Sequence, residues 1–253
     1  MGGTRRIVFA NQKGGVGKTT TAVNLGAAMA ATDKRVLLVD FDPQANSSTS
    51  LGCDGEDGGV YELITGSLGP DQVIQHTAVA GLDMVPSSIN LAGAAVELVT
   101  VERRDFYLSD ALDPLEALYD YVFIDCPPSL GILTMNGLVA ASHVIIPLQC
   151  EYFALEGLSE LLKTIRRVQG TLNPRLKVGG ILFTMFDART RLSQEVVREV
   201  TEFFRHQVFR TIIPRNVRLG EAPSYSQPIQ LYDPKCIGAR SYNELAREVC
   251  RDV

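Results

Sequence analysis

Two lysines near the N-terminus enclose a short run of glycines. Lys13 and Lys18 flank Gly14-Gly15-Val16-Gly17, and Thr19 and Thr20 follow directly. Glycine lets backbone amides approach an anion, lysine neutralises phosphate charge, and a threonine hydroxyl can bind Mg²⁺. The spacing therefore predicts a phosphate-binding loop, with Lys18 on the β- and γ-phosphates. Lys13 is not required for that purpose within one subunit, so its presence needs a separate explanation.

The segments around the loop support this prediction, although Gln12 stands where the general motif has a glycine. Residues 6–10 form an apolar, β-rich run that predicts a strand. Residues 20–31 are rich in alanine and carry apolar side chains at helical spacing. A glycine loop between a strand and a helix N-terminus is an anion site, because unpaired amides and the helix dipole both favour phosphate.

Aspartates follow two further predicted strands. Residues 35–39 lead into Asp40 and Asp42, and residues 121–124 lead into Asp125. Carboxylates at the carboxyl ends of parallel strands, beside a phosphate loop, are suited to hold a metal and an attacking water. Asp42 is followed by Pro43, so a simple chain turn is the alternative for that residue.

Together these segments resemble the deviant Walker A ATPases, and specifically the ParA/Soj partition proteins. The resemblance runs from about residue 5 to residue 250 and involves residues 13–20, 40–44, 125–129, 151–157, 184–190, 213–219 and 221–223. Phe41, Ala45 and the Cys236-Ile237 pair depart from the family pattern. None of these departures falls on a residue expected to touch phosphate or metal.

The resemblance implies an ATPase that forms a face-to-face dimer around two ATP molecules with Mg²⁺. Lys13 of one subunit would reach phosphate held by the other, which would make Lys13, Lys18 and Asp42 the catalytic residues, Asp42 orienting the attacking water. The residues that hold the nucleotide would be Lys13, Gly14, Gly15, Val16, Gly17, Lys18, Thr19 and Thr20 at the phosphates and Met185, Pro214 and Asn216 at the adenine. Thr19, Asp40 and Asp125 would hold Mg²⁺, the two aspartates mainly through water.

The charge of the chain is distributed unevenly. The net charge is −5, yet residues 1–162 hold 8 Lys and Arg against 20 Asp and Glu. Residues 163–218 hold 12 Lys and Arg against 4 Asp and Glu, a balance of +8. A basic segment in an acidic protein is a candidate footprint on nucleic acid, although solvated helix faces would give the same count.

Within the basic segment, four arginines are predicted to bind DNA. Arg189 and Arg218 are favoured because they lie in segments that resemble the family, and Arg191 and Arg215 are weaker candidates. Contacts to phosphates predict sequence-independent, salt-sensitive binding to double-stranded DNA. The resemblance further implies a ParB/Spo0J-like centromere-binding partner that stimulates slow ATP hydrolysis and so releases the DNA.

The whole chain is expected to form one domain. Strand and helix patterns alternate along residues 1–253, which predicts a single α/β domain with a doubly wound, mostly parallel twisted sheet. Helices are expected over residues 155–168, 193–204 and 239–249, and a mobile, nucleotide-sensing loop over residues 46–59. The five cysteines form no C-x-x-C pair and are expected to be reduced and mostly buried.

No apolar run is long enough for a membrane span, and the chain is expected to be cytoplasmic and associated with the nucleoid. A membrane-associated relative of the MinD type would need a basic amphipathic tail, and residues 247–253 are short and mixed in charge. A reductase of the nitrogenase iron-protein type would need cluster-binding cysteines. A ParA relative that positions a plasmid or protein complex stays open, because the partner determines the cargo.

Overall fold

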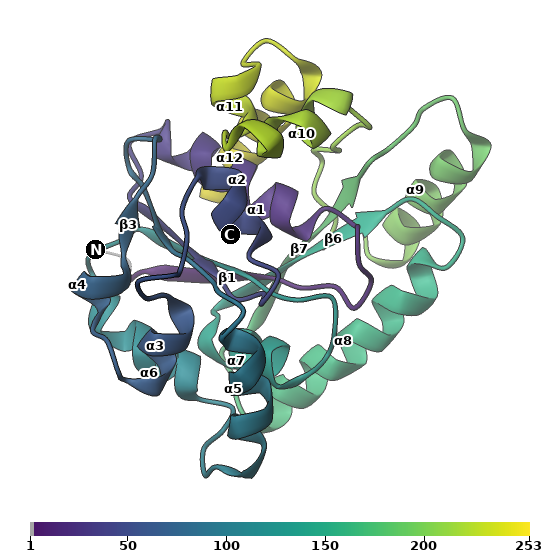
Figure 1. The fold of residues 1–253 in the computed structure, drawn as a ribbon. Coiled ribbons are helices and arrows are strands. Elements are labelled where there is room, and N and C mark those ends of the chain that lie inside the picture. The colour runs from purple at the N-terminus through teal and green to yellow at the C-terminus, as the bar shows by residue number, and fades with distance from the viewer. Residues whose placement is uncertain (1–2) are drawn as a thin grey trace.

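The computed structural model describes residues 3–253, except for the side chain of Ala95. Its centre is a seven-stranded sheet in the order β3-β4-β2-β5-β1-β6-β7 (Figure 1). Every neighbouring pair is parallel except β3 with β4. The strands are β1 (Arg5–Phe9), β2 (Val36–Asp40), β3 (Gln75–His76), β4 (Leu82–Val85), β5 (Tyr121–Asp125), β6 (His143–Gln149) and β7 (Lys177–Thr184). The expected doubly wound, mostly parallel sheet is confirmed.

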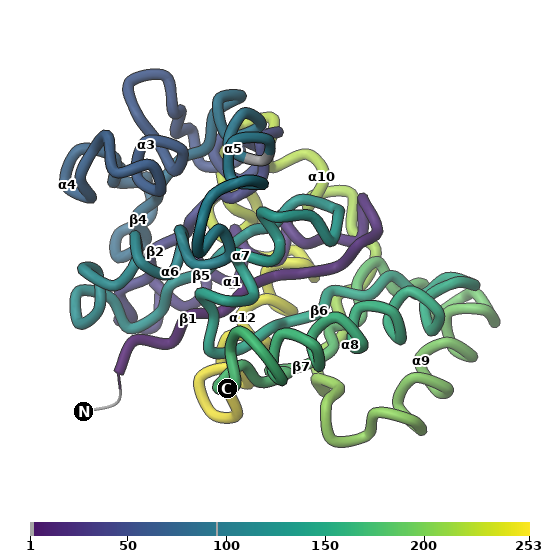
Figure 2. The backbone as a smooth tube through the Cα atoms, turned by 90° about the horizontal axis from the view of Figure 1, so that it is seen from below, coloured from purple at the N-terminus to yellow at the C-terminus, as the bar shows by residue number. Residues whose placement is uncertain are grey.

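Helices cover both faces of the sheet, as expected when parallel strands are joined by crossover helices (Figures 1 and 2). One face carries α1 (Lys18–Ala30), α10 (Val217–Glu221), α11 (Ile229–Tyr232) and α12 (Ile237–Asp252). The other carries α3 (Val60–Thr65), α5 (Leu91–Glu97), α6 (Tyr107–Leu112), α7 (Ile132–Ala140), α8 (Ala154–Thr171) and α9 (Arg191–Phe203). The short helices α2 (Asn46–Leu51) and α4 (Pro70–Val73) complete the set.

Each central strand is buried on both sides, which explains its continuous apolar sequence. In β1, Ile7 and Phe9 pack into the core beside α1 and α12, whereas Val8 packs into the core beside α7 and α8. Strand side chains alternate between faces, so one strand supplies both cores. The rigid sheet fixes the positions of the loops that leave its carboxyl edge.

The longer predicted helices are present, with one difference in packing. In α8 the apolar residues Leu158, Leu161, Leu162, Ile165 and Val168 are buried, and in α12 so are Tyr242, Leu245, Ala246 and Val249. In α9, Val196 and Val200 are buried, but Phe203 is 70% exposed. The next residue, Phe204, is partly buried and packs against the core, so one phenylalanine of this pair faces inward and the other faces solvent.

The prediction of a loop over residues 46–59 is wrong in its first half, because residues 46–51 form α2. Serine, threonine and asparagine suggested irregular structure, since their side chains compete with the backbone for hydrogen bonds. In α2, Ser50 and Thr49 instead donate to the carbonyl oxygens of Asn46 and Ala45 at 2.7 and 3.0 Å. Ser47 and Ser48 are buried against carboxylates. Tertiary contacts thus stabilise a helix that local propensity disfavours.

Candidate nucleotide site

The glycine loop follows β1 and leads directly into α1. Gly15 and Gly17 have φ values of 73° and 86°, a left-handed conformation that glycine adopts without strain. Between them, the carbonyl oxygen of Val16 accepts a hydrogen bond of 2.8 Å from Thr184 Oγ1 at the end of β7. The loop is therefore fixed to the sheet at its centre while its glycines stay at the surface of a cavity.

Lys18 is held at the base of this loop. Its side chain is buried, and its Nζ donates to the carbonyl oxygen of Lys13 at 3.1 Å. The backbone N–H of Lys13 donates in turn to Asn11 Oδ1 at 3.0 Å. Burial lowers the pKa of Lys18, while the negative charge of Asp125 opposes this shift. A buried ammonium group beside a cavity is well placed to bind an anion, which would supply the missing negative charge.

The two aspartates among the predicted metal residues lie side by side on neighbouring strands. Asp40 at the end of β2 is directly opposite Asp125 at the end of β5. Their side chains are 0% and 1% exposed. Burial raises the pKa of both carboxyls, and for Asp40 the negative charge of Asp125 adds to the shift. The hydroxyl groups of Thr19 and Ser47 oppose the shift for Asp125, and Ser48 opposes it for Asp40. Two buried carboxylates at one sheet edge create a strong local demand for positive charge.

This arrangement fits Mg²⁺. Among the described residues, the buried Oδ1 atom of Asp125 has no hydrogen-bond partner. In residues 3–253, no group of three or more His, Cys, Asp or Glu side chains could enclose a metal by itself. Mg²⁺ commonly keeps several waters and binds through one or two carboxylates together with substrate phosphates. The free oxygen and the small number of carboxylates both match that mode.

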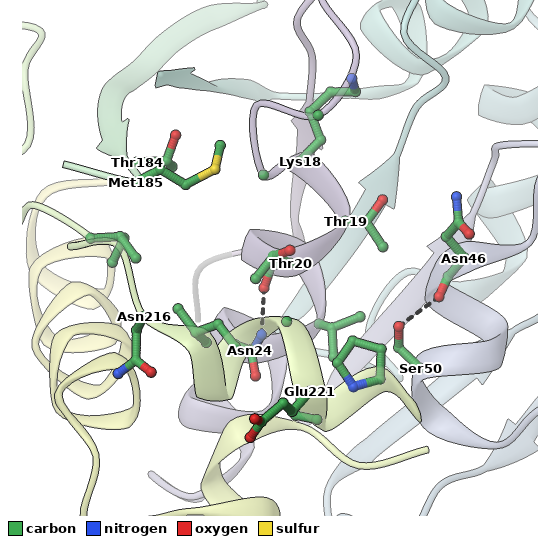
Figure 3. Close-up of a pocket in the computed structure, with 18 of the residues that line it drawn as sticks. Lys18, Thr19, Thr20, Asn24, Asn46, Ser50, Thr184, Met185, Asn216 and Glu221 are labelled. Atoms are coloured by element: carbon green, nitrogen blue, oxygen red, sulfur yellow. Dashed lines mark hydrogen bonds between the residues drawn. The ribbon is translucent and has the colours of Figure 1, made fainter. Parts of the chain in front are cut away.

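A cavity of 780 Å³ connects the loop to the predicted adenine residues (Figure 3). That volume lies in the usual range for small-molecule and cofactor sites. Its lining includes Gly14, Gly15, Gly17, Lys18, Thr19, Thr20, Asp42, Met185, Pro214 and Asn216. The structure therefore brings together residues that lie as far apart in the sequence as Gly14 and Asn216. Val16, Asp40 and Asp125 lie behind this lining as supporting residues rather than on it.

The end of the cavity that is predicted to hold adenine has a defined backbone. Phe186 and Pro214 form an isolated parallel bridge, which places Met185 beside the segment that leads to α10. Met185 has φ 49°, an uncommon left-handed value for a residue with a side chain. The Oδ1 atom of Asn216 accepts a hydrogen bond from the backbone N–H of Arg218 at 2.8 Å and caps α10. Asn216 therefore has a structural role that the sequence did not reveal.

Lys13 lies apart from the cavity lining. Its side chain is half exposed, and its Nζ forms an ion pair of 2.5 Å with Glu151 Oε1, just before α8. Beside this pair, Tyr152 and Phe153 are 80% and 64% exposed. Within its own subunit Lys13 thus faces outward, next to exposed aromatic side chains.

The predicted DNA-binding arginines are exposed, but three of them carry local partners. Arg189 pairs with Asp187 at 2.7 Å, Arg191 with Glu195 at 2.7 Å and Arg218 with Glu221 at 2.8 Å. Arg215 lines the outer part of the nucleotide cavity and forms no ion pair within residues 3–253. Of the four arginines, Arg215 lines the cavity, Arg218 lies in α10, Arg191 begins α9, and Arg189 lies just before α9.

Several residues of the site were not found from the sequence. Asn24 lines the cavity and is 5% exposed, with its Nδ2 donating to the carbonyl oxygen of Thr20 at 2.7 Å (Figure 3). Its Oδ1 accepts from the backbone N–H of Ile229 at 2.7 Å, which ties α1 to α11. A lone asparagine in an alanine-rich helix was the available signal. Thr184 and Ser47, in contrast, carry no local sequence signal.

Comparisons with known proteins identify the family. A family model described as an AAA domain matches residues 4–178. The chromosome-partitioning ATPase Soj of Treponema pallidum is 57% identical over 245 residues, covering 97% of this chain and 96% of that protein. This chain belongs to the Soj/ParA family of partition ATPases. The sporulation initiation inhibitor protein Soj of Bacillus subtilis is 53% identical, covering 96% of this chain and 97% of that protein.

Solved structures of similar proteins support the same fold. A Mycobacterium smegmatis protein named cobyrinic acid a,c-diamide synthase, with a bound ATP analogue and magnesium, has a TM-score of 0.86 and 41% identity, covering 98% of this chain and 95% of that chain. A Borrelia burgdorferi putative plasmid partition protein bound to AMPPNP has a TM-score of 0.81 and 26% identity, each chain covered to 98%. Within residues 3–253 of this Soj/ParA chain, no helix has the length and apolar character to span a membrane.

Proposed function

We propose that this protein is an ATP-dependent switch for DNA segregation, built as a single P-loop ATPase domain over residues 1–253. Mg-ATP drives a sandwich dimer, the dimer binds double-stranded DNA without sequence preference, and hydrolysis releases it. A ParB/Spo0J-like partner stimulates the slow hydrolysis, and the protein works in the cytoplasm on the nucleoid. Relatives named chromosome-partitioning ATPase Soj support the segregation role.

The position of Lys13 is the observation that carries this proposal. Lys13 belongs to the phosphate loop but is half exposed and lies outside the lining of its own cavity. A long, mobile ammonium group in that place is suited to reach phosphate bound by a second subunit. Binding of ATP in two facing cavities would give each Lys13 a phosphate partner, which couples the nucleotide state to dimer formation.

Within one subunit, each group has a distinct task. The backbone amides from Gly14 to Thr20 bind the phosphates, and Lys18 neutralises charge on the β- and γ-oxygens. Thr19, with Asp40 and Asp125 acting through water, holds Mg²⁺, which supplies charge neutralisation for the phosphoryl group. Asp42, 7% exposed on the cavity wall, orients the attacking water. Met185, Pro214 and Asn216 enclose the adenine.

For DNA, the dimer presents two copies of the arginine set. Arg189, Arg191, Arg215 and Arg218 are exposed, and phosphate can replace the carboxylate partners of three of them. Pairs between exposed side chains contribute only about 0.2–1 kcal/mol, so such an exchange is energetically accessible. Doubling the number of phosphate contacts steepens the salt dependence, which makes strong binding a property of the dimer.

The variant Lys13→Ala tests this function. It is expected to keep ATP binding but to lose ATP-dependent dimerisation and DNA binding together. Analytical ultracentrifugation and DNA-binding titrations with ATPγS, ADP and no nucleotide measure these properties. Lys235→Ala is the matched control, because Lys235 is an exposed lysine outside the basic segment of residues 163–218. Dimerisation of the Lys13 variant with ATP, or equal DNA affinity of the native protein with ADP and ATP, contradicts the proposal.

A further inference from the structure

Two consecutive serines of α2 hold the two buried carboxylates of the site. Ser47 Oγ donates to Asp125 Oδ2 at 2.8 Å. Ser48 donates to Asp40 Oδ2 twice, from its Oγ at 2.7 Å and from its backbone N–H at 2.8 Å. The four side chains are between 0% and 2% exposed. One short helix thus contacts the carboxyl ends of both β2 and β5.

The register of the sheet makes this double contact possible. Asp40 and Asp125 are opposite each other on neighbouring strands, and the backbone N–H of Phe41 donates to the Asp125 carbonyl at 2.9 Å. Successive residues of a helix point about 100° apart, so neighbouring positions can reach neighbouring strands. A shift of α2 would change the surroundings of both carboxylates together.

The hydrogen bonds leave one carboxylate oxygen free. Asp40 Oδ2 has both donors of Ser48, and Asp40 Oδ1 accepts from the backbone N–H of Asp42 at 3.3 Å. Asp125 Oδ2 is bound by Ser47, whereas the buried Asp125 Oδ1 has no hydrogen-bond partner within the described part of the chain. An unsatisfied buried acceptor is unfavourable, so its retention points to a ligand that completes it.

We propose that Ser47 and Ser48 are positioning residues for Mg²⁺. Ser47 fixes the orientation of Asp125 so that its free Oδ1 faces the hydrated metal. Ser48 fixes the orientation of Asp40 through its Oδ2. This inference rests on the proposed Mg-ATP site and assigns α2 the task of orienting the carboxylates of that site. Removing a hydrogen-bond partner of this kind commonly lowers metal affinity by about 10–100-fold.

The two serines are expected to differ. Loss of the Ser47 hydroxyl leaves Asp125 Oδ2 without its donor, whereas Asp40 without the Ser48 hydroxyl still accepts from two backbone N–H groups. Ser48 Oγ also accepts from the backbone N–H of Ser87, beyond the end of β4, at 2.9 Å. Ser47→Ala should therefore mainly weaken Mg²⁺ binding, and Ser48→Ala should mainly lower the melting temperature.

The test follows the binding of a fluorescent ADP analogue while Mg²⁺ is titrated, with a parallel measurement in EDTA. Ser47→Ala is expected to raise the Mg²⁺ concentration at half-saturation about tenfold and to leave the affinity in EDTA unchanged. Ser47→Thr keeps the hydroxyl and should restore the native value. Ser159→Ala is the control, because the Oγ of Ser159 donates to a backbone carbonyl, that of Leu155 in α8, and Ser159 does not line the nucleotide cavity.

The Mg²⁺ titrations distinguish failure of the proposed role of Ser47 from failure of the proposed Mg-ATP site. The proposal is overturned if Ser47→Ala keeps the native Mg²⁺ dependence, or if its ADP affinity in EDTA falls as much as its affinity with Mg²⁺. If Ser47→Ala does not fold, Ser47→Cys replaces it, since a thiol fills the same space but donates only weakly. A native protein whose nucleotide binding is independent of Mg²⁺ contradicts the proposed Mg-ATP site itself, which is a separate failure.

Discussion

The nucleotide site and the arginine-rich segment hold their charges in opposite ways. Lys18, Asp40 and Asp125 are 6%, 0% and 1% exposed, and they are fixed by strand ends and by the loop backbone. The side chains of Arg189 and Arg191 are 86% and 91% exposed, and each pairs with a carboxylate close by in the sequence. The first region holds its charges in fixed positions inside the protein, whereas the second can rearrange when a partner arrives.

This difference changes the meaning of the charge count. The balance of +8 in residues 163–218 suggests a continuous positive surface. Within this surface, Asp187 and Glu195 already neutralise two of the candidate arginines, and Glu221, just outside the segment, neutralises Arg218. Counting charges therefore overestimates the free positive charge, although exposed pairs of this kind exchange easily with phosphate.

The largest effect is expected from a substitution of Lys18 in the nucleotide site. Lys18→Ala removes the buried ammonium and leaves Asp125 without its positive neighbour. ATP binding is expected to fall at least about 100-fold, since a charge-assisted contact in a desolvated site is lost. Titration with a fluorescent ATP analogue measures this loss. A decrease of less than about fivefold would mean that backbone amides alone bind the phosphates.

The arginines of the candidate DNA surface differ in whether they form an ion pair within the subunit. Arg215 has no ion pair within residues 3–253, whereas Arg191 must first leave Glu195 to reach DNA. Arg215→Ala is expected to weaken DNA binding about two- to fivefold more than Arg191→Ala, and to reduce the salt slope by about 0.9. Titrations at several salt concentrations in ATPγS measure both values. Equal effects of the two substitutions would mean that local pairing does not limit DNA contact.

The predicted phosphate and metal residues could be located from the sequence because each has a local signature. Glycines before a lysine, and aspartates after apolar runs, mark the ends of strands that a parallel sheet must bring together. The pairing of Ser47 with Asp125 could not be predicted, because it depends on how a six-residue helix packs across two strands. The N-cap role of Asn216 could not be predicted either, because the sequence at the start of α10 has no clear helical spacing of apolar residues.

Removing the carboxylate partner of Arg189 should have the opposite effect to removing an arginine. Asp187 accepts two side-chain hydrogen bonds from Arg189, which hold the pKa of Asp187 well below its usual range and keep it ionised at neutral pH. Asp187→Asn removes that charge, so DNA affinity in ATPγS is expected to rise about two- to fivefold at low salt. Asp252→Asn is the control, because Asp252 pairs with Arg251 at the end of α12. A fall in affinity would show that Asp187 orients Arg189 for DNA.

The smallest effect is expected at the ion pair between Lys13 and Glu151. Lys13 belongs to the phosphate loop, but this pair is partly exposed like those of the arginine-rich segment. This ion pair joins the phosphate loop to the start of α8, and both side chains are partly exposed. In the proposed dimer Lys13 must leave Glu151 to bind phosphate of the other subunit, so the pair opposes dimerisation by about 0.2–1 kcal/mol.

Glu151→Gln should therefore tighten the ATP-dependent dimer about two- to fivefold, while ATP binding by the monomer stays unchanged. Sedimentation equilibrium in ATPγS measures the dimer constant, and the gain should shrink as salt screens the native pair. Glu160→Gln, which releases Lys163 on the same helix α8, controls for a general change in charge. A weaker dimer would mean that Glu151 contacts the second subunit directly, and the exposed start of α8 would then belong to the interface rather than act as a restraint on Lys13.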